Sequence, residues 1–192
     1  FRRSRGLGDV YKRQWHQWAE PMAVALNIAY TLGYQAGEVW AFPVGGLGSG
    51  LFLAICWQRQ LKLEAFLWLY YIGMAVYGAW AVQSAWPDPL PTASLEAHAL
   101  SIGLGLIAWW ALGRFFKGKS WRPRLDAFTT VGSLVATYWM LQFVHANWLY
   151  WIVVNAVSVF LYASRGLKWG TGLFVLYTLL ALEGWFNFIP HL

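Results

Sequence analysis

Two stretches of the chain decide its fold: residues 59–80 read RQLKLEAFLWLYYIGMAVYGAW, and residues 165–186 read RGLKWGTGLFVLYTLLALEGWF. At a constant offset of 106 positions, seven pairs of these residues are identical: Arg59/Arg165, Leu61/Leu167, Lys62/Lys168, Leu67/Leu173, Tyr71/Tyr177, Ala75/Ala181 and Gly78/Gly184. Both copies begin with a basic turn and continue as a long hydrophobic span. A duplicated membrane segment predicts a transporter built from two repeats, with its site where the repeats meet.

The composition independently indicates a membrane protein. The chain is 59% hydrophobic and 11% charged, whereas soluble domains are roughly half apolar and about a quarter charged. Cys56 is the only cysteine, so neither an intrachain disulfide nor a cysteine metal cluster is possible.

The first 14 residues are set aside from the fold. Residues 9–14, DVYKRQ, read as the translation of a transposon end used in preparing sequencing libraries, so we interpret residues 1–14 as a non-native assembly scar. This segment holds five of the 14 Lys and Arg residues (Arg2, Arg3, Arg5, Lys12 and Arg13). The net charge of +6 is therefore no evidence for nucleic-acid binding, and no nucleic-acid partner is predicted.

Seven apolar spans of bilayer-crossing length follow. We place them at residues 19–36, 40–57, 62–84, 95–114, 126–144, 147–164 and 168–188. Because lipid offers no partners to unpaired backbone groups, each span is predicted to be a helix. The prediction is an all-α integral membrane protein with seven transmembrane helices in a three-one-three arrangement. Residues 15–84 form the first repeat, 85–125 a linker helix and basic loop, and 126–192 the second repeat.

The charges between the spans predict the orientation in the bilayer. If the seven spans alternate, one set of loops holds every cationic residue after the scar: Arg59, Lys62, Arg114, Lys117, Lys119, Arg122, Arg124, Arg165 and Lys168. The positive-inside rule then places the N-terminus in the cytoplasm and the C-terminus outside. Three spans followed by one inverting span give both repeats the same orientation, which is the parallel-repeat arrangement.

Polar and aromatic residues inside the spans indicate where a ligand binds. Asn155 lies four residues after Trp151 and seven after Trp148, which places all three on one helical face. Trp40 occupies a comparable position at the start of the span 40–57. Stacked rings with a few amides suit a flat heteroaromatic ligand, and a cationic one would gain about 2 kcal/mol over a desolvated Trp. An interfacial belt would also explain Trp148.

Other polar residues keep two interpretations at this stage. Thr129, Thr130, Ser133 and Thr137 could line a cavity or bond their own helix backbone. Catalytic interpretations are weaker, because the four His residues are scattered and no span carries a pair of carboxylates. We therefore predict no catalytic residue, metal or cofactor. A membrane enzyme and a non-transporting receptor or scaffold remain as alternatives to a transporter.

Residues 125–130 (LDAFTT) and 147–155 (NWLYWIVVN) resemble the PnuC family of bacterial vitamin-precursor transporters. The motifs Leu161-Tyr162, Arg165-Gly166-Leu167, Leu180-Ala181 and Gly184 fit the same pattern, as do Trp40-Ala41-Phe42-Pro43, Tyr71 and Tyr77-Gly78. The resemblance implies a fold related to SWEET sugar transporters in the opposite membrane orientation, within the bacterial inner membrane. It further implies facilitated diffusion of nicotinamide riboside, trapping by a cytoplasmic kinase, and a homo-oligomer, a trimer by family resemblance.

Three departures from the family pattern concern the substrate. Ala146 stands where the nicotinamide riboside branch has a Trp, Trp68 where a Gln is common, and Asn155 where an Asp is usual. Nicotinamide riboside is the leading prediction, with thiamine or riboflavin as alternatives. The predicted substrate-binding residues are Trp40, Trp68, Tyr71, Asn147, Trp148, Trp151, Asn155 and Tyr177.

The repeat-related tyrosines and glycines have competing interpretations. Tyr71 and Tyr177 either line the route or pack between helices, whereas Gly78 and Gly184 are expected to permit close helix approach. Differences between the repeats should mark the substrate: Trp68 against Phe174, Tyr77 against Glu183, and Ser49 against Asn155.

Overall fold

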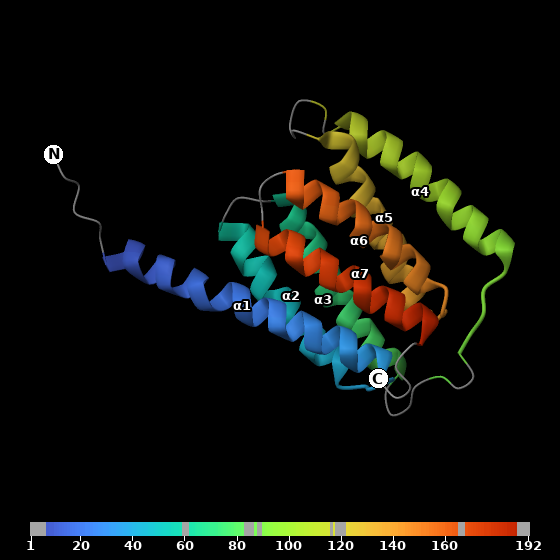
Figure 1. The fold of residues 1–192 in the computed structure, drawn as a ribbon, viewed down its shortest axis with the longest axis horizontal. Helices are drawn as coiled ribbons and strands as arrows, with labels where there is room; N and C mark the ends of the chain where they lie inside the picture. Colours follow the sequence, from blue (N-terminus) through green and yellow to red (C-terminus); the bar gives the residue numbers. More distant parts are fainter. Residues whose placement is uncertain are drawn as a thin grey trace. The chain divides into compact units, whose positions relative to one another are not determined.

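The computed structural model of the chain describes residues 7–58, 62–82, 87, 90–115, 117, 122–164 and 168–187, with side chains except those of 7–17, 62–64, 168 and 169. These residues form seven helices (Figure 1): α1 (Leu7–Gln35), α2 (Ala41–Gln58), α3 (Lys62–Val82), α4 (Leu95–Phe115), α5 (Pro123–Leu141), α6 (Asn147–Ser164) and α7 (Lys168–Phe186). Part of the predicted scar, Gln83 and several of the basic loop residues lie outside the described residues.

The helices coincide with the predicted spans to within a few residues, with one exception. Helix α1 begins at Leu7 rather than near residue 19. Hydropathy detects only the part of a helix that crosses lipid, and a helix can continue into water without apolar residues. The start of α1 therefore could not be read from the apolar pattern.

The duplication extends beyond the two stretches in which it is visible. Adding 106 to the bounds of α2, Ala41 and Gln58, gives Asn147 and Ser164, which are the bounds of α6. The same offset takes the end of α1 to the end of α5, and the start of α3 to the start of α7. Three whole helices were thus duplicated.

The chain divides into two compact units, residues 1–86 with α1–α3 and residues 87–192 with α4–α7. In the first unit α2 packs against both α1 and α3, and in the second unit α6 packs against both α5 and α7. The remaining helix, α4, packs along α5 (Figure 1). Each repeat therefore has its second helix in the middle of the packing.

A glycine and an aromatic ring bring the second and third helices of each repeat together. A Cβ atom at Gly78 of α3 would fall on the ring of Phe42 in α2, and one at Gly184 of α7 would fall on the ring of Trp148 in α6. The ring positions differ by the same 106 residues as the glycine positions. Both glycines permit close helix approach, as predicted, because a side chain there would collide with the ring.

The first and second helices pack by a contact whose large and small partners are exchanged between repeats. A Cβ at Gly48 of α2 would fall on the side-chain amide of Asn27 in α1 and would lie 3.2 Å from Cβ of the neighbouring Leu26. The equivalent pair in the second repeat is Val154 and Gly132, where a Cβ at Gly132 would lie 2.7 Å from Cγ2 of Val154. The small residue therefore belongs to α2 in one repeat and to α5 in the other.

Helix α4 attaches to α5 through one of its faces. The residues on this face, spaced three or four apart, are His98, Ser101, Gly105, Trp109 and Gly113. Near the middle of the helix, a Cβ at Gly105 would lie 3.4 Å from Cγ2 of Val135. The Trp109 ring packs edgewise on Phe128 with ring centres 6.1 Å apart. The linker helix thus has a continuous seam with the second repeat.

Four of the described helices are long and apolar enough to cross a membrane by length and composition: α2, α4, α6 and the Ala65–Val82 part of α3. Residues Gly170–Phe186 of α7 form a shorter apolar helix. Helix α5 carries the hydroxyl side chains of Thr129, Ser133 and Thr137, of which the last two are buried. A helix with a polar buried face needs neighbouring protein rather than lipid on that side.

The exchanged contact predicts a compensating pair of mutations. We expect Gly132→Leu to lower the free energy of unfolding by about 1–3 kcal/mol through overpacking against Val154. Val154→Gly alone should cost about 1 kcal/mol or more, because glycine weakens a helix and leaves a gap. The double variant reproduces the Leu26/Gly48 arrangement, so it should lose less than the sum of the two. Thermal unfolding in detergent measures the coupling, and additive losses would contradict the contact.

Candidate functional site

The predicted site residues of the second repeat lie on α6. The helix follows a tight turn in which Phe143 has a positive φ of 56°. The backbone N–H of Asn147 donates to the Val144 carbonyl at 2.9 Å, which starts the helix at Asn147. Asn147, Trp148 and Asn155 are buried, and Trp151 is half-buried on the same side of the helix. The α6 face predicted from the residue spacing is therefore directed into the second unit.

Asn147 has a hydrogen-bonding group with nothing to bind. Its side chain is 2% exposed, and its Nδ2 donates to the Val144 carbonyl at 2.8 Å. Its Oδ1 is buried and has no hydrogen-bond partner in the described part of the chain. A buried acceptor without a partner costs roughly 1–3 kcal/mol. Such an atom in a native protein needs an explanation, and a ligand N–H group is one.

Two further polar side chains lie deeper on the same face. Asn155, two turns after Asn147, is 5% exposed, and Ser158 one turn later is also buried. The Ser158 hydroxyl donates to the Val154 carbonyl at 2.8 Å, so its proton is already used within the helix. Asn155 is thus the better candidate for a ligand contact at this depth.

Two of the hydroxyl groups of α5 bond their own helix. Thr129 donates to the Leu125 carbonyl at 3.1 Å, and Thr137 donates to the Ser133 carbonyl at 2.7 Å. Asn27 of α1 likewise donates to the Ala23 carbonyl at 2.8 Å. These bonds satisfy the donors locally, which favours the structural interpretation of Thr129 and Thr137.

The predicted site residues of α3 belong to an aromatic cluster in the first unit. Trp68 stacks on Phe52 of α2, with ring centres 4.4 Å apart and planes inclined by 17°. Tyr71 packs edgewise on Trp68 at 5.4 Å and 74°. One face of the Trp68 ring is therefore already covered by Phe52, which leaves at most its other face for a ligand.

The second repeat has a matching cluster built from different residues. Phe174 takes the place of Trp68, and Tyr177 packs edgewise on it at 6.2 Å and 78°. Phe174 also packs on Tyr162 of α6, with ring centres 4.7 Å apart. Tyr71 and Tyr177 thus make the same edgewise contact in both repeats, which favours packing over substrate binding for this pair.

Trp40 lies just before α2 and covers Gly33 of α1, since a Cβ at Gly33 would lie 2.7 Å from Cη2 of the ring. It is 47% exposed. The structure therefore gathers Asn147, Trp148, Trp151 and Asn155 on one helix and Trp68 with Tyr71 on another. Within the first unit, Trp40 belongs to the contact between the segment before α2 and helix α1.

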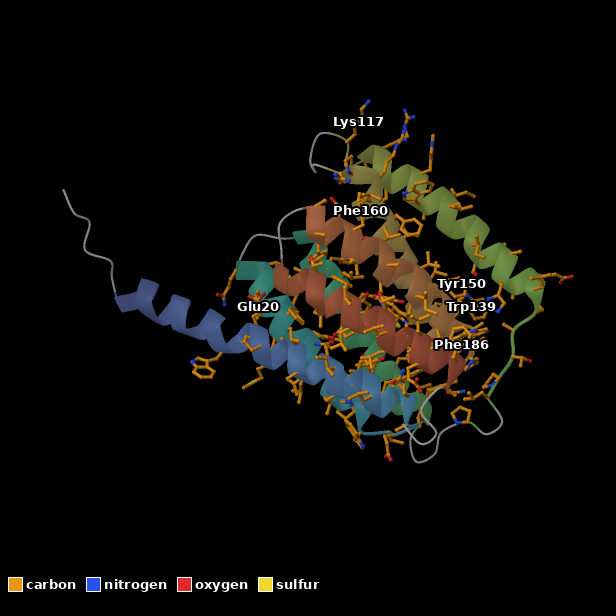
Figure 2. The ribbon with its side chains drawn as sticks, in the orientation of Figure 1. Glu20, Lys117, Trp139, Tyr150, Phe160 and Phe186 are labelled. Atoms are coloured by element: carbon orange, nitrogen blue, oxygen red, sulfur yellow. The ribbon has the colours of Figure 1, made fainter. Side chains whose placement is uncertain are left out.

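A polar network on α4 was not predicted from the sequence. His98 Nδ1 and the Tyr150 hydroxyl of α6 are hydrogen-bonded at 2.8 Å. The centre of the His98 ring lies 4.4 Å from the ring centre of Trp139 in α5. The Trp139 indole N–H donates to the Ser101 hydroxyl at 3.1 Å. Figure 2 shows Trp139 and Tyr150 at the same end of α5 and α6. The spacing of His98 and Ser101 on one α4 face was the available signal.

This network connects the linker helix to the helix that carries the candidate site. Tyr150 is in the first turn of α6, three residues after Asn147 and one before Trp151. Fixing its hydroxyl fixes the orientation of that turn. Among the described residues, no group of three His, Cys, Asp or Glu side chains could hold a metal ion.

A sequence profile described as nicotinamide mononucleotide transporter matches residues 17–189. The chain belongs to this family. The riboflavin/roseoflavin transporter RibM of Streptomyces davaonensis is 26% identical over 178 residues, which cover 87% of this chain and 82% of the relative. The nicotinamide riboside transporter PnuC of Escherichia coli is 27% identical over 177 residues, which cover 74% of each chain.

A solved structure shows the fold. The crystal structure of the vitamin B3 transporter PnuC matches with a TM-score of 0.75 at 19% identity, covering 93% of this chain and 83% of that one. The resemblance to the PnuC family inferred from the sequence is therefore confirmed, as is the all-α membrane fold with seven helices in three-one-three order. The chain is a multi-pass membrane protein of a transporter family.

The His98–Tyr150 bond predicts energetic coupling between α4 and α6. His98→Ala and Tyr150→Phe should each lower the free energy of unfolding by about 0.5–1.5 kcal/mol. Because both remove the same bond, the double variant should lose little more than the worse single variant. Tyr138→Phe, at an exposed ring of α5, is the matched control and should have little effect. Thermal unfolding in detergent is the measurement, and strictly additive losses would exclude the coupling.

Proposed function

We propose that the chain carries a flat, vitamin-like heteroaromatic molecule across the membrane by facilitated diffusion, with nicotinamide riboside as the first candidate. The observation that supports this most is the buried Oδ1 of Asn147, which has no partner in the described part of the chain. It lies beside Trp148 and one turn from Trp151, on the face that also carries Asn155. An acceptor among indole rings suits a flat ring with an N–H donor.

Nicotinamide riboside has both chemical features. Its carboxamide offers N–H donors for Asn147 Oδ1, and its pyridinium ring is flat and positively charged. A cation over a desolvated indole gains about 2 kcal/mol, which the half-buried ring of Trp151 can supply. Asn155 can then bind a ribose hydroxyl, since an amide both donates and accepts hydrogen bonds.

Riboflavin is the second candidate, and the comparison with RibM favours it. That relative covers 87% of the chain, against 74% for the nicotinamide riboside transporter, at nearly the same identity. The isoalloxazine ring is flat, carries an imide N–H donor and is neutral. Ala146 in place of a Trp would leave more room for this larger ring. Thiamine remains the further alternative within the family.

The remaining features of the proposal follow from the family resemblance and the charge pattern. We place the chain in the bacterial inner membrane, with the N-terminus in the cytoplasm and the C-terminus outside. A cytoplasmic kinase would trap the substrate as its phosphate, and the protein would act as a homo-oligomer, a trimer by resemblance. No chemical step by the chain itself is part of the proposal.

Uptake into proteoliposomes tests the function. Purified protein should accumulate labelled nicotinamide riboside down its gradient, with riboflavin and thiamine as parallel substrates. Preferred uptake of riboflavin would select the second candidate. Binding of a substrate without uptake would indicate a receptor, and turnover of a substrate would indicate an enzyme. Absence of uptake of all three would count against the proposal.

Trp151→Ala should abolish uptake while leaving membrane insertion intact, because it removes the stacking ring but no packing glycine. Trp18→Ala is the matched control, since Trp18 is an exposed Trp of α1 and its loss should leave uptake unchanged. The measurement is the initial rate of substrate uptake into proteoliposomes, normalised to the amount of inserted protein. Equal rates for the two variants would place the site elsewhere than on α6.

Asn147→Leu should weaken substrate binding by at least about tenfold, which is the loss of one buried hydrogen bond of roughly 1.4 kcal/mol. Stability should change by no more than about 1 kcal/mol, because the substitution removes both the bond to Val144 and the unpaired acceptor. Titration calorimetry with nicotinamide riboside and thermal unfolding of the same sample separate the two effects. A large loss of stability with unchanged affinity would assign Asn147 a structural role.

A further inference from the structure

Four cationic side chains gather where α4 ends and α5 begins. Arg114 is in the last turn of α4, Lys117 follows it, and Arg122 and Arg124 flank the start of α5 at Pro123. Figure 2 shows Lys117 at the same end of the second unit as Phe160, with Trp139 and Tyr150 toward the opposite end of their helices. This basic end is therefore distinct from the His98 network and from the Asn147 turn.

Two of the guanidinium groups lie over exposed aromatic rings. Cζ of Arg114 is 5.0 Å from the ring centre of Trp110, and Cζ of Arg122 is 5.1 Å from that of Phe160 in α6. Trp110 is 63% exposed and Phe160 57% exposed. Each arginine is thus held over a ring, whose face attracts the cation, while the ring remains open on its outer side.

The backbone beneath this surface is held in place. The Trp109 indole N–H donates to the Arg124 carbonyl at 2.7 Å. A Cβ at Gly113 would lie 3.7 Å from Cγ of Arg124, so the end of α4 and the start of α5 are in close contact. Contacts through Arg124 and Arg122 therefore join the ends of α4, α5 and α6. These contacts fix the backbone positions from which the cationic side chains extend.

The described cations at this end outnumber the described carboxylates. Asp126 is the one acidic residue in the first turn of α5, against the four cations of Arg114, Lys117, Arg122 and Arg124. The resulting net positive charge favours a negatively charged partner. A soluble phosphate would contact the cations alone, whereas a phospholipid would also contact the exposed rings of Trp110 and Phe160.

We infer that this surface binds the headgroup of an anionic phospholipid, with the cations on the phosphate and the exposed rings against the glycerol and upper acyl chains. Aromatic rings favour the depth of the membrane interface, and basic residues next to them attract anionic headgroups. The residues that form this arginine–aromatic surface are Trp110, Arg114, Lys117, Arg122, Arg124 and Phe160. The inference does not depend on which substrate is carried.

Lipid titration of the purified full chain tests the inference. Native mass spectrometry in neutral detergent should detect retained phosphatidylglycerol, with phosphatidylcholine bound at least about fivefold more weakly. The double variant Arg114→Gln/Arg122→Gln should lose roughly 25-fold in apparent affinity, since each cation near an anionic headgroup contributes about fivefold. Glycerol phosphate at the same concentrations should neither bind detectably nor displace the lipid.

The matched control is Lys62→Gln/Lys168→Gln, which removes the same two charges from other helix starts. It should retain phosphatidylglycerol nearly as well as the unaltered chain. Equal losses of phosphatidylglycerol affinity in both double variants would show that the effect comes from net charge alone. Displacement of the lipid by glycerol phosphate would indicate a simple anion site. Either result overturns the inference.

If the arginine variant does not fold, Lys117→Gln, at an exposed residue, provides the test. This variant should lose about fivefold in apparent affinity for phosphatidylglycerol. Unchanged binding of the lipid would overturn the inference too.

Discussion

An aromatic ring lying on a glycine holds each repeat together, as Phe42 on Gly78 and Trp148 on Gly184. Lipid tails are as apolar as Leu, so helices in a membrane associate through close packing rather than through the hydrophobic effect. The second contact also positions the candidate site. With Trp148 fixed against α7, its neighbour Asn147 is held in the buried first turn of α6, and Trp151 follows one turn later.

Much of the fold could be predicted because its signals are local. The hydropathy pattern located each helix, and the repeated Gly78 and Gly184 indicated close approach without any knowledge of the partner ring. The start of α1 at Leu7 was missed, because residues 1–14 had been set aside and the first turns of this helix are too polar to give a hydropathy signal. The seam of α4 with α5 was missed for a related reason: it depends on small residues such as Gly105 and Gly113, which hydropathy does not distinguish from their neighbours.

The candidate site was predictable only as a helical face. The spacing of Trp148, Trp151 and Asn155 located that face, but spacing along one helix does not reveal what fills the space opposite it. Trp68 illustrates the difference: its ring is stacked on Phe52, whose counterpart in the second repeat is Ser158. Contacts between residues far apart in sequence, such as His98 with Tyr150, depend on how the helices pack. The spacing of His98 and Ser101 indicates a polar face of α4, but not which residue that face contacts.

The exchanged contact between Leu26/Gly48 and Gly132/Val154 has a consequence for the history of the gene. Recombination that copied α5 over α1 would place a glycine, the copy of Gly132, at position 26 opposite Gly48 and leave a gap. Copying α6 over α2 would place a valine, the copy of Val154, at position 48, where it would collide with Asn27 and Leu26. Homogenisation of the two halves one helix at a time would therefore disturb this contact. The two copies have become a pair of unlike parts, and each keeps this contact only if its first and second helices are copied together.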